Sequence, residues 1–196
     1  MTVADRTRVA APTGPFAAWR TWDILLAAII GVAFGLFFFV WNGLYAGLEF
    51  IQPPVLKDVV YGGWLIPAVL APALIRKPGA AVFAEMVAAG VSVLFGTPWG
   101  PDVLLSGFVQ GAAAELVFAM TGYRTWSLPV LAAAAVGSAI GAWLHDWAIY
   151  YAETAIDIQL IRLALMAVSA VVLAGFGALA IERSLRKAGV LEGRAG

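Results

Sequence analysis

The sequence of 196 residues contains no cysteine and a single histidine. Without cysteine the chain cannot form a disulfide, a thiolate nucleophile or an iron–sulfur cluster. One histidine with no cysteine also argues against a structural zinc site, which needs several such ligands. We therefore expect neither a bound metal nor a cofactor.

Charged residues are scarce as well. They make up 12% of the chain, whereas a soluble domain carries about 25%. The net charge is zero, which gives no support to nucleic-acid binding. Hydrophobic residues make up 62% of the chain and the mean hydropathy is +0.90. The polar residues are too few to cover a globular protein in water. Most of the chain must therefore lie in a lipid bilayer.

Long apolar runs recur along the chain, and about 20 such residues suffice for a helix to cross the hydrocarbon. Breaks rich in Pro and Gly separate them, and Pro67 and Pro72 predict kinks in the second run. We predict an all-α integral membrane protein with six transmembrane helices. The expected helices cover residues 23–45, 59–75, 80–95, 103–121, 128–150 and 160–181, within a membrane domain at 23–182 flanked by cytoplasmic segments at 1–22 and 183–196.

Basic residues are distributed unevenly between the expected loops. If the N-terminus is cytoplasmic, ten basic residues lie inside and only Lys57 and Arg162 lie outside. Such a bias predicts that both termini face the cytoplasm, with the chain in the cell membrane. The ten are Arg6, Arg8, Arg20, Arg76, Lys77, Arg124, Arg183, Arg186, Lys187 and Arg194.

Several polar side chains interrupt the apolar runs, where charge is costly and usually functional. Glu85 lies in the third run, Gln110 and Glu115 in the fourth, and His145 and Asp146 near the outer end of the fifth. No basic residue stands at a matching depth, so these groups predict a polar cavity for a cationic or hydrogen-bonding ligand. Alternatively, the carboxyls are protonated and bonded to neighbouring helices, and His145 packs at the interface.

Aromatic residues gather toward the expected outer face, where most of them suit anchoring at the membrane interface. Trp64, at a helix start, and Trp99, in a tight Gly/Pro loop, fit that role less well. Aromatic faces beside carboxylates suit a flat cationic heterocycle, through stacking and cation–π contact. The predicted substrate-binding residues are Glu85, Gln110, Trp64, Tyr61, Trp99, Glu115, Asp146 and His145.

Small residues form a stripe on the first expected helix. Ala27, Gly31 and Gly35 are four apart and share a face, which lets another helix backbone approach closely. The face either packs within the chain or docks a partner membrane subunit. We take docking as the functional hypothesis.

Catalytic motifs are missing from the sequence. Ser106 and His145 could form a pair, but Leu104-Leu105-Ser106-Gly107 lacks the G-x-S-G setting of rhomboid proteases. One histidine cannot supply an H-E-x-x-H cluster, and no P-loop is present. We therefore predict that the chain is not an enzyme and does not itself hydrolyse ATP.

Nearly the whole chain, and residues 60–150 most specifically, resembles the YkoE-type substrate-binding (S) components of energy-coupling factor (ECF) vitamin transporters. Order and spacing of short motifs carry the resemblance. They are Tyr61-Gly62-Gly63-Trp64, Ile75-Arg76-Lys77-Pro78-Gly79-Ala80-Ala81, Glu85, Gly96-Thr97-Pro98-Trp99-Gly100-Pro101, Val109-Gln110-Gly111, Ala114-Glu115, Tyr123 to Leu131 and Asp146.

The resemblance implies a six-helix S component that captures thiamine or its hydroxymethylpyrimidine (HMP) precursor on the outer side. It also implies a transmembrane coupling (T) subunit and two ABC-type ATPases as partners. Two other classes stay open. One is a stand-alone secondary transporter that couples protons through Glu85 and Glu115, and the other is a membrane assembly subunit that transports nothing.

Overall fold

A computed structural model describes residues 14, 16, 18–48 and 54–189 of the chain. Most of the expected N-terminal segment and the second half of the expected C-terminal tail therefore lie outside the described residues, as do Arg6, Arg8 and Arg194. The described residues form helices and connecting turns without a β-strand, which confirms the all-α prediction.

Six passes account for the helices. The second pass joins η2 to α2, and the sixth runs continuously through α6, η3 and α7. All passes except α3, which has 15 residues, are long and apolar enough to cross a bilayer. The elements are α1 (Thr21–Gly47), the 3-10 helix η2 (Pro54–Gly63), α2 (Ile66–Ile75), α3 (Ala80–Leu94), α4 (Asp102–Met120), α5 (Leu128–Ile149), α6 (Ile156–Ser169), the π-helix η3 (Ala170–Phe176) and α7 (Gly177–Lys187).

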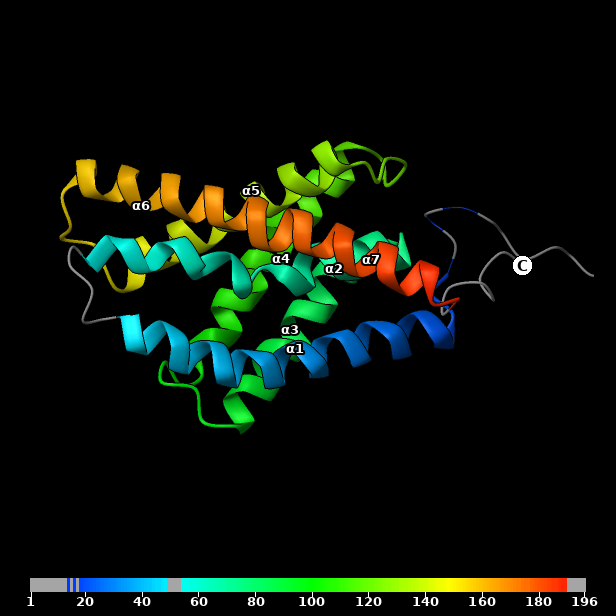
Figure 1. The fold of residues 1–196 in the computed structure, drawn as a ribbon, viewed down its shortest axis with the longest axis horizontal. Coiled ribbons are helices and arrows are strands. Elements are labelled where there is room, and N and C mark those ends of the chain that lie inside the picture. The colour runs from blue at the N-terminus through cyan, green and yellow to red at the C-terminus, as the bar shows by residue number, and fades with distance from the viewer. Residues whose placement is uncertain (1–13, 15, 17, 49–53, 190–196) are drawn as a thin grey trace, which may run out of the picture.

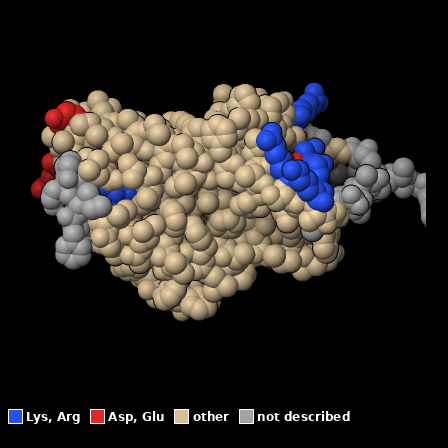
Figure 2. All heavy atoms as spheres, in the orientation of Figure 1, with Lys and Arg blue, Asp and Glu red and all other residues tan. Residues whose placement is uncertain are grey.

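Several passes run along the long axis of the molecule (Figure 1). In Figure 1, α1, the η2–α2 pass and the α6–α7 pass run along the length of the molecule. The end of α1 and the starts of η2 and α6 meet at one end, while the start of α1 and the end of α7 meet at the other. Figure 2 shows most of the visible Lys and Arg gathered over the α7 end, acidic residues with a smaller basic patch at the opposite end, and an uncharged band between them. This distribution is that of a protein whose middle lies in hydrocarbon.

The second pass changes helix type before it reaches Pro67 and Pro72. The 3-10 helix η2 ends at Gly63, and α2 begins at Ile66. Pro67 lies in the first turn of α2, where a backbone N–H would have no partner within the helix, so its absence costs nothing. Pro72 lies inside the helix. Nearly all of α2 is buried, because α1, α3, α4, α5, η3 and α7 surround it.

The stripe of small residues on α1 faces α3. An ideal Cβ added to Gly31 would lie 2.5 Å from the Val87 Cβ and 2.9 Å from the Ala84 carbonyl oxygen. One added to Gly35 would meet the Val91 Cβ at 2.4 Å. At Gly31 and Gly35 this face is therefore filled within the chain, as the packing alternative predicts, and Ala27 is buried as well. The structure thus argues against the hypothesis that Ala27, Gly31 and Gly35 dock a partner subunit. The spacing showed that a helix could approach closely, but not which helix it was.

Replacing Gly31 with leucine should destabilise the fold, because the new side chain must push α3 away. Overpacking of this kind costs about 1–3 kcal/mol. Gly43 lies on the same helix with no heavy atom within 4 Å of an added Cβ, so Gly43→Leu is the matched control. We expect a clearly lower thermal unfolding midpoint in detergent for Gly31→Leu and a midpoint near wild type for Gly43→Leu. Equal midpoints would contradict this packing.

Candidate ligand-binding site

A cavity of about 320 Å³ lies between α1, η2, α3, α4 and α5. Residues from separate parts of the chain line it, several of them polar despite their place in apolar helices. The lining residues are Phe38, Asn42, Tyr45, Lys57, Tyr61, Trp64, Glu85, Ala89, Ser92, Thr97, Trp99, Asp102, Val103, Ser106, Gly107, Gln110, His145, Asp146, Tyr150 and Tyr151.

One wall of the cavity is an array of aromatic rings around Trp64. The ring centroids of Tyr45, Tyr61 and Trp99 lie 4.8, 5.2 and 5.6 Å from that of Trp64, all edge to face. The Trp64 indole N–H donates to Asn42 Oδ1 at 3.0 Å, which fixes the orientation of the ring. Such an array offers a rigid surface on which a flat heterocycle can stack.

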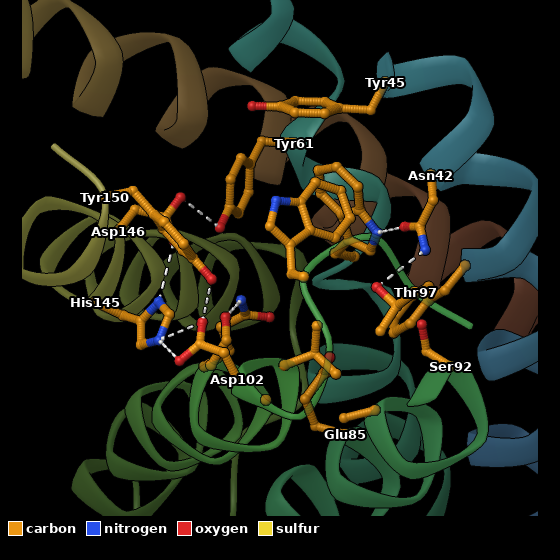
Figure 3. Close-up of a pocket in the computed structure, with 18 of the residues that line it drawn as sticks. Asn42, Tyr45, Tyr61, Glu85, Ser92, Thr97, Asp102, His145, Asp146 and Tyr150 are labelled. Carbon is orange, nitrogen blue, oxygen red and sulfur yellow. Dashed lines mark hydrogen bonds and ion pairs between the residues drawn. The ribbon is translucent and has the colours of Figure 1, made fainter. Parts of the chain in front are cut away.

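A second wall carries two carboxylates joined by an imidazole (Figure 3). His145 Nδ1 lies 3.1 Å from Asp146 Oδ1, and His145 Nε2 lies 3.3 Å from the carboxylate of Asp102. Tyr61 donates to Asp146 Oδ2 at 2.9 Å, and Tyr150 donates to Asp102. We call the three bridged groups the Asp102–His145–Asp146 cluster.

A buried ion pair lies next to this wall. Arg162 Nε lies 2.9 Å from Asp58 Oδ2, and both side chains are almost wholly buried. Its guanidinium also lies 3.8 Å from Asp146 and over the Tyr151 ring, 3.8 Å from the centroid. For Asp146, this corrects the expectation that the acids lack a basic partner at their depth. Arg162 lies in α6 (Ile156–Ser169), within the span of 160–181 that the sequence predicted for the sixth helix.

Glu85 and Gln110 line the cavity from α3 and α4. Glu85 is 1% exposed, and among the described residues its Oε2 has no hydrogen-bond partner. Gln110 Nε2 donates to Ser106 Oγ at 2.6 Å. Buried polar atoms nearly always have a partner, so the Glu85 carboxyl group suits a ligand that brings its own donor.

The structure brings together every predicted substrate-binding residue except Glu115. It adds others that the sequence reading missed, among them Asn42, Asp102 and Ser92. Asp102 follows Gly100-Pro101, where an acid reads as an ordinary helix start. Asn42 carried a usable signal, because an amide in an apolar helix is as notable as a carboxyl there.

Glu115 has a structural role outside the cavity. Its two carboxylate oxygens accept from the backbone N–H groups of Gly79, at 2.7 Å, and Ala81, at 2.9 Å. These lie at the start of α3, where a helix has unpaired N–H groups and favours negative charge. Burial, together with a hydrogen bond to Glu115, raises the pKa of the Tyr123 hydroxyl. The carboxyl therefore caps a helix, which corrects its assignment to the substrate site.

Three comparisons bear on this arrangement. Residues 22–141 match the family described as "ABC-type cobalt transport system, permease component". The protein YkoE of Bacillus subtilis (strain 168), named as an HMP/thiamine permease, is 36% identical over 179 residues, which cover 91% of this chain and 90% of the relative. A solved structure described as a crystal structure of an S-component of an ECF transporter is also 36% identical. It superposes with a TM-score of 0.87 and a coverage of 91% of each chain.

Proposed function

The chain belongs to the S components of ECF transporters, and on that premise we propose that its substrate is thiamine or the precursor HMP. As an S component it is the substrate-binding subunit of an ECF-type importer and works with a coupling subunit and ATPases. The name of YkoE, which refers to HMP and thiamine, supports the choice of substrate.

The observation that carries the proposal is the chemistry of the cavity. Thiamine combines a permanently positive thiazolium ring with an aminopyrimidine, and HMP contains the pyrimidine alone. The aromatic array around Trp64 suits a flat ring. The unpartnered carboxyl oxygen of Glu85 suits the exocyclic amine or the cationic ring, and the amide of Gln110 can both donate and accept at a pyrimidine edge.

Cobalt, which the matching family model names, fits this cavity less well as cargo. Divalent cobalt takes several nitrogen and oxygen ligands from the protein. Within the described residues no group of three or more His, Cys, Asp or Glu side chains could hold a metal ion. An aromatic wall also supplies no ligand to a bare cation of this kind. We therefore expect thiamine to bind and Co²⁺ not to compete with it.

The energy for uptake comes from partner subunits in this proposal. The sequence has no P-loop, so ATP is hydrolysed by two ABC-type ATPases joined through the coupling subunit, and this chain is not an enzyme. The competing proton-coupled transporter needs both Glu85 and Glu115 as carriers, but Glu115 caps α3 away from the cavity.

The orientation in this proposal follows the charge pattern. Both termini face the cytoplasm, the protein lies in the cell membrane, and the cavity lies toward the outer side. The described basic residues support this, because most of them gather over the α7 end, while acidic residues and a smaller basic patch lie at the other end (Figure 2).

Replacing Glu85 with glutamine should weaken thiamine binding at least tenfold. Truncating one partner of a buried charge-assisted hydrogen bond typically costs about 2–5 kcal/mol, and each ~1.4 kcal/mol is tenfold in Kd. The measurement is calorimetric titration of the purified protein with thiamine and then with HMP. Equal losses for the two ligands place Glu85 at the pyrimidine edge, and a larger loss for thiamine places it at the thiazolium.

The matched control is Glu115→Gln. It makes the same chemical change in the membrane domain but outside the cavity, so it should lower thermal stability while the Kd for thiamine stays near wild type. An unchanged Kd for Glu85→Gln would remove Glu85 from the site. No binding of either ligand to the wild-type protein would overturn the proposed substrate.

A further inference from the structure

His145 is held between two carboxylates in a way that depends on its protonation. Its two ring nitrogens face Asp146 at 3.1 Å and Asp102 at 3.3 Å. A neutral imidazole has one N–H, so it can donate to only one of these groups, whereas an imidazolium can donate to both. With ionised carboxylates, the Asp102–His145–Asp146 cluster therefore has a formal charge of −1 when His145 is protonated and −2 when it is not.

Groups around the cluster do not cancel this charge. Tyr61 and Tyr150 donate neutral hydroxyl hydrogen bonds to the two carboxylates. The Arg162 guanidinium lies 3.8 Å from Asp146, but its charge is already balanced by Asp58 at 2.9 Å. Lys57 also lines the cavity, on the side of Tyr45, with its ammonium 4.9 Å from that ring centroid. The wall formed by the cluster is therefore negative in either protonation state.

A separate observation shows that the cavity is built for a polar ligand. Glu85 lines the same cavity, is almost completely buried, and has a carboxyl oxygen with no hydrogen-bond partner among the described residues. Figure 3 places Glu85 apart from Asp102, His145 and Asp146, which lie together on another part of the lining. The cavity thus offers two separate polar regions, the Glu85 carboxyl group with one unpartnered oxygen and the negative cluster.

We propose that the Asp102–His145–Asp146 cluster is the subsite for a positive charge on the ligand and sets the preference for a cationic heterocycle over a neutral one. The proposal rests on the proposed function, because it concerns the same cavity. It assigns the thiazolium of thiamine to the cluster and leaves the pyrimidine edge to Glu85. The Glu85→Gln substitution should then raise the Kd for HMP and the Kd for thiamine by the same factor.

The proposal has a pH dependence with a definite sign. As pH rises through the titration of His145, the charge of the cluster changes from −1 to −2. A cationic ligand is then attracted more strongly, while a neutral ligand of the same shape is not. The affinity ratio between the two ligands should therefore increase with pH, and titration of the pyrimidine, which both ligands share, cancels in that ratio.

The experiment compares thiamine with its neutral analogue in which a thiophene ring replaces the thiazolium. Kd values for both are measured by calorimetry on the purified full chain between about pH 5.5 and pH 8.5, which spans the titration of an ordinary histidine. The preference for thiamine should grow about fivefold or more across this range, as expected for one added charge near the ligand. His145→Gln keeps a hydrogen-bonding side chain but cannot titrate, so its preference should not change with pH.

Asp102→Asn tests the charge directly. It should weaken thiamine binding about tenfold and leave the neutral analogue near its wild-type Kd, which also shows that the variant is folded. A wild-type preference that does not change with pH would overturn the cation subsite, and this readout needs no variant at all. If thiamine and HMP both fail to bind the wild-type protein, the proposed substrate fails and the subsite fails with it.

Discussion

Replacing Gly62 with alanine should leave only a small fraction of the protein folded. An ideal Cβ at this position would lie 2.3 Å from the carbonyl oxygen of Ser169, 2.6 Å from its carbonyl carbon and 2.8 Å from the backbone nitrogen of Ala170. These are backbone atoms at the point where α6 becomes η3, so they cannot rotate away as a side chain could. The change would also disturb the hydrogen bond from the Gly62 N–H to Ser169 Oγ, at 2.9 Å.

We expect the free energy of unfolding to fall by about 3 kcal/mol or more, which is at the upper end of the cost of overpacking. The measurement is the fraction of monodisperse protein after heating in detergent. Gly90→Ala is the control, because an added Cβ there meets nothing within 4 Å. Alanine in mid-helix is favoured over glycine by about 1 kcal/mol, so this control should be at least as stable as wild type. A Gly62→Ala protein as stable as Gly90→Ala would show that η2 and the sixth pass do not approach this closely.

Replacing Arg162 with methionine should lower the free energy of unfolding by a similar amount, because it breaks a buried ion pair. The substitution leaves Asp58 buried without its partner and removes the cation beside Asp146. Breaking a buried ion pair from one side costs about 3–5 kcal/mol, whereas replacing both partners with apolar groups is often neutral. We therefore expect Asp58→Leu with Arg162→Met to recover much of the stability lost by Arg162→Met alone.

The pair formed by Arg186 and Glu182 on α7 provides the control for that experiment. Its separation is short, 2.5 Å, but the Arg186 side chain is 59% exposed. Exposed pairs contribute about 0–1 kcal/mol, so Arg186→Met should unfold close to the wild-type temperature. If Arg162→Met unfolds at the same temperature as Arg186→Met, the Asp58–Arg162 pair does not hold η2 against α6.

The six passes could be predicted from apolar runs separated by breaks rich in Pro and Gly, although the run that forms α3 is shorter than the others. The start of the sixth helix could not. Asp157 and Gln159 precede the predicted start at residue 160, yet α6 begins at Ile156 and buries Gln159 and Arg162 inside the protein. Arg162 is tolerated there because Asp58 neutralises it, and nothing in a single sequence shows that two residues so far apart are neighbours.

The sequence predicted that polar residues inside apolar runs form a polar cavity, but not which of them line it. Polar residues inside apolar runs must be satisfied, but the sequence does not show whether a ligand or the protein satisfies them. For Glu85 the described structure supplies no hydrogen-bond partner to one carboxyl oxygen, whereas for Glu115 it supplies the backbone of Gly79 and Ala81. The same limit applies to Gly31, whose small size predicted a close neighbour without identifying α3.

The enclosure of α2 has a consequence for the order in which the protein is assembled during synthesis. Pro72 has no N–H to donate to the carbonyl of Ala68, and in hydrocarbon an unpaired backbone carbonyl costs several kcal/mol. Other helices surround α2, and α7 is the last of them to emerge from the ribosome. The second pass therefore enters the membrane early but gains its final neighbours late. Misassembly before α7 arrives should expose this proline-containing segment to the quality-control machinery of the membrane.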